Sequence, residues 1–251
     1  MDFQLRGRTA LVTGASQGIG RGIARLLALE GVKVVGAARR THLVEELSAS
    51  VVAEGGERII AVAADLFQDS AAAQLAAAAK AAVGPIDILM NVAGASMPLD
   101  FDAPQERWEE GMTLNFYRVR QLTHELIPDM RARGWGRVVN FTGTSEPRML
   151  NAAFTAKAAV HVWAKGLSRE VAPFGITVNS LQPGRIHSEQ MRKRYPTPEL
   201  EREHAQAEIP MGRFGEPEEI GALAVFLASG PASFVTGAVI PVDGGASRFA
   251  F

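Results

Sequence analysis

The sequence predicts an α/β protein with a doubly wound, mostly parallel sheet of seven strands and helices on both faces. Short β-branched runs alternate with longer alanine- and leucine-rich segments along most of the 251 residues. The short runs are apolar without interruption, as strands buried on both faces of a sheet require. Such alternation implies right-handed crossovers between parallel strands.

The elements are expected in strict alternation, with one exception. Strands are expected at Thr9–Val12, Val32–Ala37, Ile59–Ala63, Ile86–Asn91, Arg137–Phe141, Ile176–Leu181 and Ala238–Val242. Helices are expected at Gly20–Glu30, His42–Glu54, Asp69–Ala82, Arg107–Arg133, Ala152–Val171 and Glu216–Ala228. The polar, proline-bearing stretch 185–212 breaks the rhythm and is expected to form a lid over a ligand. No repeat or linker divides the chain, so residues 1–251 are predicted to form one domain.

Composition excludes several classes of function. The 26 Lys and Arg nearly balance the 27 Asp and Glu, so no net field draws the chain to nucleic acid or to an anionic membrane. The absence of cysteine removes disulfides, thiolate metal sites and a cysteine nucleophile, and no metal site is predicted. The N-terminal residues lack a signal-peptide layout and no apolar run reaches the length of a membrane span, so a cytoplasmic protein is expected.

A glycine-rich turn follows the first expected strand and opens the first expected helix. Glycine is needed in such a turn because the backbone bends sharply and must approach a pyrophosphate, which the helix N-terminus then stabilises. The position between a strand and a helix makes this signal specific, whereas a glycine triplet alone is weak. We therefore predict a dinucleotide site that includes Gly14, Ser16, Gln17, Gly18, Ile19 and Gly20; a turn without a ligand is the alternative.

The spacing of these glycines resembles that of the short-chain dehydrogenase/reductase family, and further motifs extend the resemblance along the chain. Asn91-Val92-Ala93-Gly94 is similar to the family's Asn-Asn-Ala-Gly motif, and Val242-Asp243-Gly244-Gly245 to its closing signature. The resemblance implies a Rossmann fold, NAD(P)-dependent oxidoreductase activity on a small-molecule substrate, and a homotetramer. It also implies cofactor contacts at Asp65, Leu66, Asn91, Ala93, Gly94, Lys157, Pro183, Gly184, Ile186 and Ser188.

The end of the second expected strand predicts which dinucleotide binds. A carboxylate there accepts hydrogen bonds from the ribose 2′-hydroxyl of NAD, whereas cationic residues accommodate the 2′-phosphate of NADP. This chain has Arg39 and Arg40 at that point and no acid before Glu45, and arginine offers a planar pair of donors to a phosphate. We predict that NADP(H) is preferred over NAD(H); two solvated charges are the alternative.

The catalytic residues implied by the resemblance are incomplete. Asn115 and Lys157 match the family's active-site asparagine and lysine, but Ala153 stands four residues before the lysine, where the family has its proton-carrying tyrosine. The family's serine position falls on Gly143, and the loop from there to position 153 is shorter than usual. Thr142, Thr144 or Ser145 could supply a hydroxyl. The predicted catalytic set is therefore Lys157, Asn115, Thr144 and Ser145.

Several groups could replace the missing acid, and each has a structural alternative. Tyr195 could swing over a substrate or pack within the lid; Tyr117 is expected to point away from Asn115. His161 could carry a proton or serve packing or a subunit contact. Glu146 could reach the substrate or pair with Arg148, His187 could reach it or be a solvated lid residue, and water relayed through Lys157 and Asn115 needs no new side chain.

Two functions are consistent with this pattern. The first is an NADP-dependent reductase or dehydrogenase that interconverts a small carbonyl compound and its alcohol with a non-standard proton donor. The alternative is a non-catalytic NADP-binding protein, redox-sensing or structural. An acidic substrate group could bind a set of cations, and the apolar C-terminus, Phe249-Ala250-Phe251, could dock on a partner subunit. The cations are Arg148, Arg185, Arg192, Lys193 and Arg194; a solvated face is their alternative.

Overall fold

Seven strands form one sheet in the order β3-β2-β1-β4-β5-β6-β7 in the computed structural model, which describes residues 2–249. Every neighbouring pair is parallel, so the predicted doubly wound sheet is confirmed. The order reverses between β1 and β4, and open α/β sheets bind ligands outside the carboxyl ends of the strands at such a point. The strands are β1 (Thr9–Thr13), β2 (Lys33–Ala38), β3 (Ile60–Ala63), β4 (Ile88–Asn91), β5 (Gly136–Phe141), β6 (Ile176–Pro183) and β7 (Val239–Val242).

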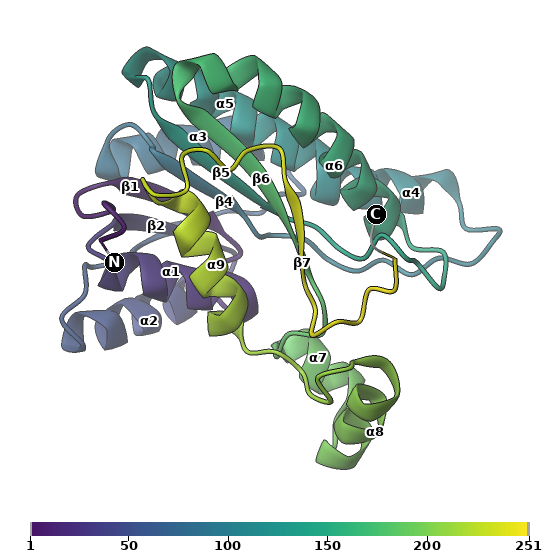
Figure 1. Cartoon of the computed structure of the whole chain (residues 1–251). Coiled ribbons are helices and arrows are strands. Elements are labelled where there is room, and N and C mark those ends of the chain that lie inside the picture. Colours follow the sequence, from purple (N-terminus) through teal and green to yellow (C-terminus); the bar gives the residue numbers. More distant parts are fainter. Residues whose placement is uncertain (1, 250–251) are drawn as a thin grey trace.

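Helices cover both faces of the sheet (Figure 1). One face carries α1 (Gly18–Leu29), α2 (Thr41–Ala53) and α9 (Pro217–Ala228), and the other carries α3 (Ala71–Val83), α5 (Arg118–Arg133) and α6 (Ala152–Val171). Each layer buries its own apolar core against the sheet: Leu27 of α1 and Ile220 of α9 belong to the first core, and Leu75 of α3 and Leu126 of α5 to the second. A short 3₁₀ turn, Ala172–Phe174, links α6 to β6.

The helix expected over Arg107–Arg133 is interrupted, so that prediction of one regular helix is wrong. The structure has α4 (Gln105–Met112), a π-helical turn η1 (Thr113–Tyr117) and then α5. The side-chain amide of Asn115 donates to the Gly111 carbonyl at 3.0 Å and so occupies an acceptor of the preceding turn. A single π turn inside a helix is frequently found at functional sites, and this one carries a predicted active-site residue.

Two helices lie within the stretch 185–212, and α8 is the element farthest from the sheet in Figure 1. They are α7 (Glu189–Arg194) and α8 (Pro198–Glu208). The Ser188 hydroxyl caps α7 by accepting from the Met191 amide, and Thr197 caps α8 in the same way. A small apolar cluster of Ala205, Ile209 and Phe214, with Met191 and Tyr195 packed against it, holds the two helices together. The stretch and the following Phe214 therefore form a small core that is separate from the two main cores.

Two further findings concern the whole described chain. Across residues 2–249, no helix has the length and apolar character that crossing a bilayer demands. Of the apolar C-terminus, Phe249 is 75% exposed, while Ala250 and Phe251 lie outside the described residues, so the predicted docking of this tail remains a prediction.

Candidate active site

The glycine-rich turn leaves no room for side chains where it meets its neighbours. A Cβ on Gly20 would lie 2.3 Å from the carbonyl oxygen of Gly14, and a Cβ on Gly14, whose φ is +71°, would lie 3.2 Å from Cα of Ala93. The backbone of the turn is therefore bare at the N-terminus of α1, as close approach of a pyrophosphate requires. These residues fit the dinucleotide that the sequence predicts.

Replacing Gly20 by alanine is expected to destabilise the protein by about 1–3 kcal/mol, the range for overpacking, and to weaken dinucleotide binding. The reason is that the new Cβ would contact backbone atoms of Gly14 rather than a flexible side chain. Urea unfolding and titration with NADP⁺ measure the two effects. Gly166→Ala is the matched control, because a Cβ there meets open space and alanine is favoured over glycine within α6. Equal effects of both substitutions would contradict the steric argument.

The ends of β1 and β4 are joined beside this turn. The Thr13 hydroxyl oxygen accepts hydrogen bonds from the backbone amides of Val92 and Ala93, each at 3.0 Å. Asn91 turns its amide inward and donates to Asn140 Oδ1 at 2.9 Å and to Thr123 Oγ1 at 3.1 Å. Asn91 thus shapes the site from within the fold. The role of Thr13 was not predicted, although its position immediately before Gly14 was a signal for it.

The two predicted phosphate-binding arginines lie exposed where β2 ends, next to the turn. Arg40 Nη2 donates to Gln17 Oε1 and to Glu189 Oε2, both at 2.9 Å. Asp65 follows β3, the strand next to β2, and its Oδ1 accepts from the backbone amide of Phe67 at 3.2 Å. The neighbouring Leu66 carbonyl accepts from Arg118 Nε at 3.0 Å. The predicted cofactor contacts Arg40 and Asp65 therefore follow the ends of adjacent strands.

The segment after β6 connects the sheet to the glycine-rich turn. Gly184 lies so close to Asp243 that a Cβ would be 2.6 Å from its Cα, and the buried Ile186 forms a parallel bridge with Gly215. Ser188, the cap of α7, comes against the turn: a Cβ on Gly18 would lie 3.1 Å from the Ser188 Cβ. The structure thus brings Ser188 and the turn together, as a shared cofactor site requires.

Asn115 and Lys157 converge on Gly94. A Cβ on Gly94 would lie 2.8 Å from Asn115 Oδ1 and 3.5 Å from Lys157 Nζ. The Lys157 ammonium donates to the Thr142 carbonyl at 3.3 Å, while Asn115 exchanges hydrogen bonds of 3.3 Å with the backbone of Ala95. Burial lowers the pKa of Lys157 to about 8. A lysine whose pKa is lowered toward the neutral range therefore lies at the carboxyl ends of the central strands.

Two small residues lie at positions close to Lys157 in the sequence or in space. Ala153 lies one helical turn before Lys157, is 2% exposed, and has its amide capped by Asn151 Oδ1 at 2.9 Å. Gly143 lies on another side, where a Cβ would be 3.6 Å from Lys157 Cδ. Neither position carries a group that can donate or accept a proton.

The two predicted catalytic hydroxyls are engaged elsewhere. Ser145 Oγ accepts from Gln182 Nε2 at 2.6 Å, and Thr144 Oγ1 accepts from the Glu146 amide at 3.0 Å. Within residues 2–249, neither hydroxyl hydrogen-bonds to Lys157 or Asn115. Both residues are exposed, and their catalytic role remains a prediction.

The structure shows where the side chains of the two tyrosines lie. Tyr195 stacks on His204, with ring centroids 4.7 Å apart, and meets Phe214 edge-on at 5.3 Å, so it takes the lid-packing alternative. Tyr117 is 43% exposed while Asn115 is 2% exposed, which confirms that the two side chains point apart.

His161 is half-buried and hydrogen-bonds to Thr142, next to the site. Its Nε2 lies 2.7 Å from Thr142 Oγ1, and that hydroxyl is 3.1 Å from the Leu181 carbonyl. Because a carbonyl only accepts, Thr142 donates its proton to Leu181 and accepts one from His161. Partial burial lowers the pKa of His161. A neutral imidazole with its Nε2 proton committed to Thr142 is the form that this geometry favours.

The expected alternative for Glu146, a pair with Arg148, is wrong. Glu146 Oε1 accepts from the backbone amides of Arg248 and Phe249 at 2.8 and 3.0 Å, because the loop turns it toward the C-terminal segment. Arg148 instead pairs with Glu208 at 2.6 Å. Glu146 therefore anchors the C-terminal segment beside the site.

Open space adjoins two of the cations predicted to bind an acidic group. A hollow of about 320 Å³ is lined by Arg185, and one of about 620 Å³ by Arg192. Within residues 2–249 neither arginine has an ion-pair partner, whereas Lys193 pairs with Glu189 at 3.0 Å. Arg194 lies over the Tyr195 ring at 5.8 Å.

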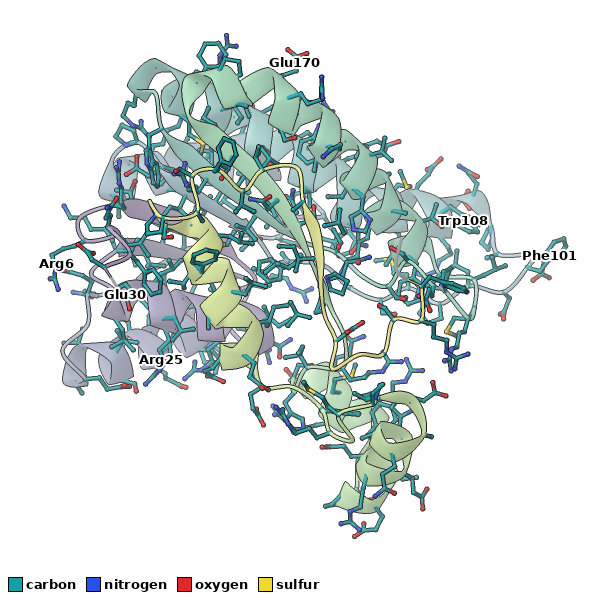
Figure 2. All side chains as sticks on the ribbon, viewed as in Figure 1. Arg6, Arg25, Glu30, Phe101, Trp108 and Glu170 are labelled. Carbon is teal, nitrogen blue, oxygen red and sulfur yellow. The ribbon has the colours of Figure 1, made fainter. Side chains whose placement is uncertain are left out.

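The loop before α4 carries an exposed aromatic side chain. Figure 2 shows Phe101 at the tip of this loop, pointing away from the sheet.

His187 ties α8 to the start of α9. Its Nε2 and Nδ1 lie 2.8 Å from Glu201 and Glu216, respectively. Burial opposes the charged form, but the hydrogen bonds and charges of both carboxylates outweigh it and raise the pKa of His187. It is therefore an ion-paired residue rather than a solvated one.

The ion pairs of His187 predict that the stability of the lid depends on pH. A raised folded-state pKa contributes stability that is complete below the unfolded value of 6.5 and is lost as the pH rises through the folded value. Amide hydrogen exchange in α8, corrected for its intrinsic pH dependence, is expected to show less protection above that range. His187→Gln is expected to abolish the difference. Persistence of the difference in this variant would assign it to another group.

Comparison with known proteins places the chain among oxidoreductases. A family model described as enoyl-(acyl carrier protein) reductase matches residues 14–247. Galactitol 2-dehydrogenase (L-tagatose-forming) of Cereibacter sphaeroides is 39% identical, over 97% of this chain and 96% of the relative. The rhamnolipids biosynthesis 3-oxoacyl-[acyl-carrier-protein] reductase of Pseudomonas aeruginosa is 36% identical, over 97% of each chain.

Solved structures agree over nearly the full length. L-sorbose reductase from Gluconobacter frateurii, complexed with NADPH and L-sorbose, superposes with a TM-score of 0.94 at 29% identity, over 99% of this chain and 100% of that one. The 3-oxoacyl (acyl-carrier-protein) reductase from Agrobacterium tumefaciens, with NADP bound, superposes with a TM-score of 0.91 at 33% identity, over 97% and 96%.

Proposed function

The chain belongs to the short-chain dehydrogenase/reductase family and is an NAD(P)-dependent oxidoreductase, and from this premise we propose that it uses NADP(H) to interconvert a small carbonyl compound and its alcohol with a proton donor other than tyrosine. The convergence of Asn115 and Lys157 on Gly94, beside the glycine-rich turn, carries this proposal. Bound NADP(H) supplies or accepts the hydride.

The binding surface for this cofactor is built from adjacent strand ends. The bare turn from Gly14 to Gly20 receives the pyrophosphate, and Arg39 and Arg40 receive the 2′-phosphate. The segments around Gly94 and Ser188 border the nicotinamide end. Relatives of similar structure that hold NADPH or NADP support the preference for the phosphorylated dinucleotide.

Lys157 supplies the proton in this proposal. Because Ala153 and Gly143 place no polar side chain around it, a water molecule on its ammonium can reach the carbonyl oxygen of a substrate. In reduction the substrate carbon gains hydride and its oxygen gains a proton from this water. Lys157 returns a proton to the water and is then reprotonated from solvent. A pKa of about 8 suits this role, since an efficient acid has a pKa near the working pH. The other candidates Tyr195, His161, His187 and Glu146 are engaged elsewhere.

The substrate class is a ketone or alcohol of the kinds on which the relatives act, polyols and ketoses or 3-oxoacyl compounds. Arg185 and Arg192, beside open space, suit a substrate with an acidic group. The proposal further includes one domain with a lid at 185–212, a cytoplasmic location and a homotetramer. Light scattering of the purified protein tests the tetramer.

A screen of NADPH oxidation over polyol-derived ketones and 3-oxoacyl thioesters tests this function, with Ala153→Tyr as the comparison. We expect turnover by the unmodified protein, and no gain in Ala153→Tyr because a phenol would fill the space of the relaying water. Faster turnover by Ala153→Tyr would contradict the proposed donor. Tight NADPH binding without turnover by either protein would favour a non-catalytic, NADP-binding role, for which the apolar position 153 is the supporting observation.

A further inference from the structure

One acidic residue of the lid contacts the predicted phosphate-binding surface. Glu189 is the first residue of α7, and its Oε2 accepts from Arg40 Nη2 at 2.9 Å. The same nitrogen donates to Gln17 Oε1 of the glycine-rich turn. Since Ser188 also lies against Gly18, the start of α7 rests on the turn, and the Arg40–Glu189 pair spans the same contact between lid and turn.

Two cations keep the Glu189 side chain in its charged carboxylate form. Its other oxygen, Oε1, pairs with Lys193 at 3.0 Å, and the hydrogen bonds from Lys193 and Arg40 lower the pKa of Glu189. The carboxylate and the guanidinium are both partly open to solvent, with side-chain exposures of 34% and 42%. An incoming phosphate can therefore reach Arg40, and it meets a carboxylate there.

A phosphate on Arg40 has two ways to bind, and Glu189 opposes both. The guanidinium either turns away from Glu189, which breaks the existing ion pair, or keeps it, which holds a dianionic phosphate beside a carboxylate. The 2′-hydroxyl of NAD carries no charge, so it neither breaks the Arg40–Glu189 ion pair nor is repelled by the carboxylate.

We propose that Glu189 is a specificity-determining residue that competes with the 2′-phosphate of NADP for Arg40, and so limits the preference for NADP over NAD. This inference rests on the proposed function, because it assumes that the 2′-phosphate binds at Arg40. Glu189 is 149 residues away from Arg40 in the sequence, and it acts on cofactor choice from the lid rather than from the β2 end.

Dissociation constants of NADP⁺ and NAD⁺, measured by isothermal titration calorimetry, test the inference. Glu189→Gln is expected to tighten NADP⁺ binding by about 1.5- to 5-fold, the range of an exposed ion pair, and to leave NAD⁺ binding unchanged. In a background of Arg40→Gln most of that gain is expected to be lost. Lys193→Gln is the matched control: it removes the other partner of Glu189 but keeps the carboxylate opposite Arg40, so NADP⁺ binding is expected not to tighten.

The opposing results are distinct. An unchanged ratio of the two dissociation constants in Glu189→Gln would overturn the inference, and so would weaker NADP⁺ binding, which would mean that Glu189 orients Arg40 for the phosphate. In both cases normal NADP⁺ binding by the unmodified protein would leave the proposed function intact. If the unmodified protein bound neither dinucleotide, the proposed function would fall, and this inference with it.

Discussion

Replacing Lys157 by methionine is expected to lower kcat/KM for carbonyl reduction by about 10² to 10⁴-fold, the range for loss of a general acid. Methionine keeps a flexible apolar stem next to Gly94 and Gly143 but removes the ammonium that donates to Thr142. Steady-state rates at saturating NADPH measure the loss. The dissociation constant of NADPH is measured in parallel, so that a loss of cofactor binding is separated from a loss of proton transfer.

Lys165→Met is the matched control for this substitution. Lys165 lies on the same helix, two turns further on. Its ammonium donates to the Gly237 carbonyl, with 3.1 Å between the two atoms, and not to any group of the site. Its replacement is expected to leave the rate within about twofold, as for most surface changes. A comparable loss in both variants would mean that methionine disturbs α6 rather than the chemistry.

The same lysine predicts the pH dependence of the reaction. Reduction needs the protonated ammonium, so its rate is expected to fall as the pH rises through about 8; alcohol oxidation needs the neutral amine and is expected to rise over the same range. The inflection is expected to vanish in Lys157→Met. If it survived there, the proton would come from another group, and His161→Gln would test the nearest one.

The sequence was sufficient to predict the features that repeat or that follow one another closely. Buried strands alternating with helices imply a parallel, doubly wound sheet, and the observed strand order agrees. The need for glycine at positions 14 and 20 follows from the same local logic, since the turn must double back onto its own helix, and the contact between the Gly20 position and the Gly14 carbonyl confirms it.

Contacts between distant parts of the chain could not be predicted. The pairing of Arg40 with Glu189 and the hydrogen bond from the Arg248 backbone amide to Glu146 join segments more than a hundred residues apart, and no local sequence pattern identifies such partners. The π turn at Asn115 escaped for another reason: apolar spacing averages over several turns, so one wide turn inside a long helix leaves it almost unchanged.

Removal of one buried cation is expected to have the largest effect on stability: Arg137→Ala should lower the free energy of unfolding by about 3 to 5 kcal/mol. Arg137 is 2% exposed. Its guanidinium donates to the carbonyls of Gly136, Gly175 and Ser229 at 2.8 to 3.2 Å, which joins β5 to the segments after α6 and α9. Alanine would remove the side-chain donor that these three carbonyls share. Urea unfolding followed by circular dichroism measures the change.

Arg8→Ala provides the comparison, because Arg8 and Arg137 both stack on Trp135, at 3.9 and 4.3 Å from the ring centroid. Arg8 is more exposed and its carboxylate partner, Asp87, is 3.9 Å away, so its loss is expected to lower the free energy of unfolding by only about 1 kcal/mol. Arg137→Met, which keeps an apolar stem over Trp135 but no donors, is expected to resemble Arg137→Ala. If it resembled the unmodified protein instead, stacking rather than the three carbonyls would explain why an arginine is buried at this position.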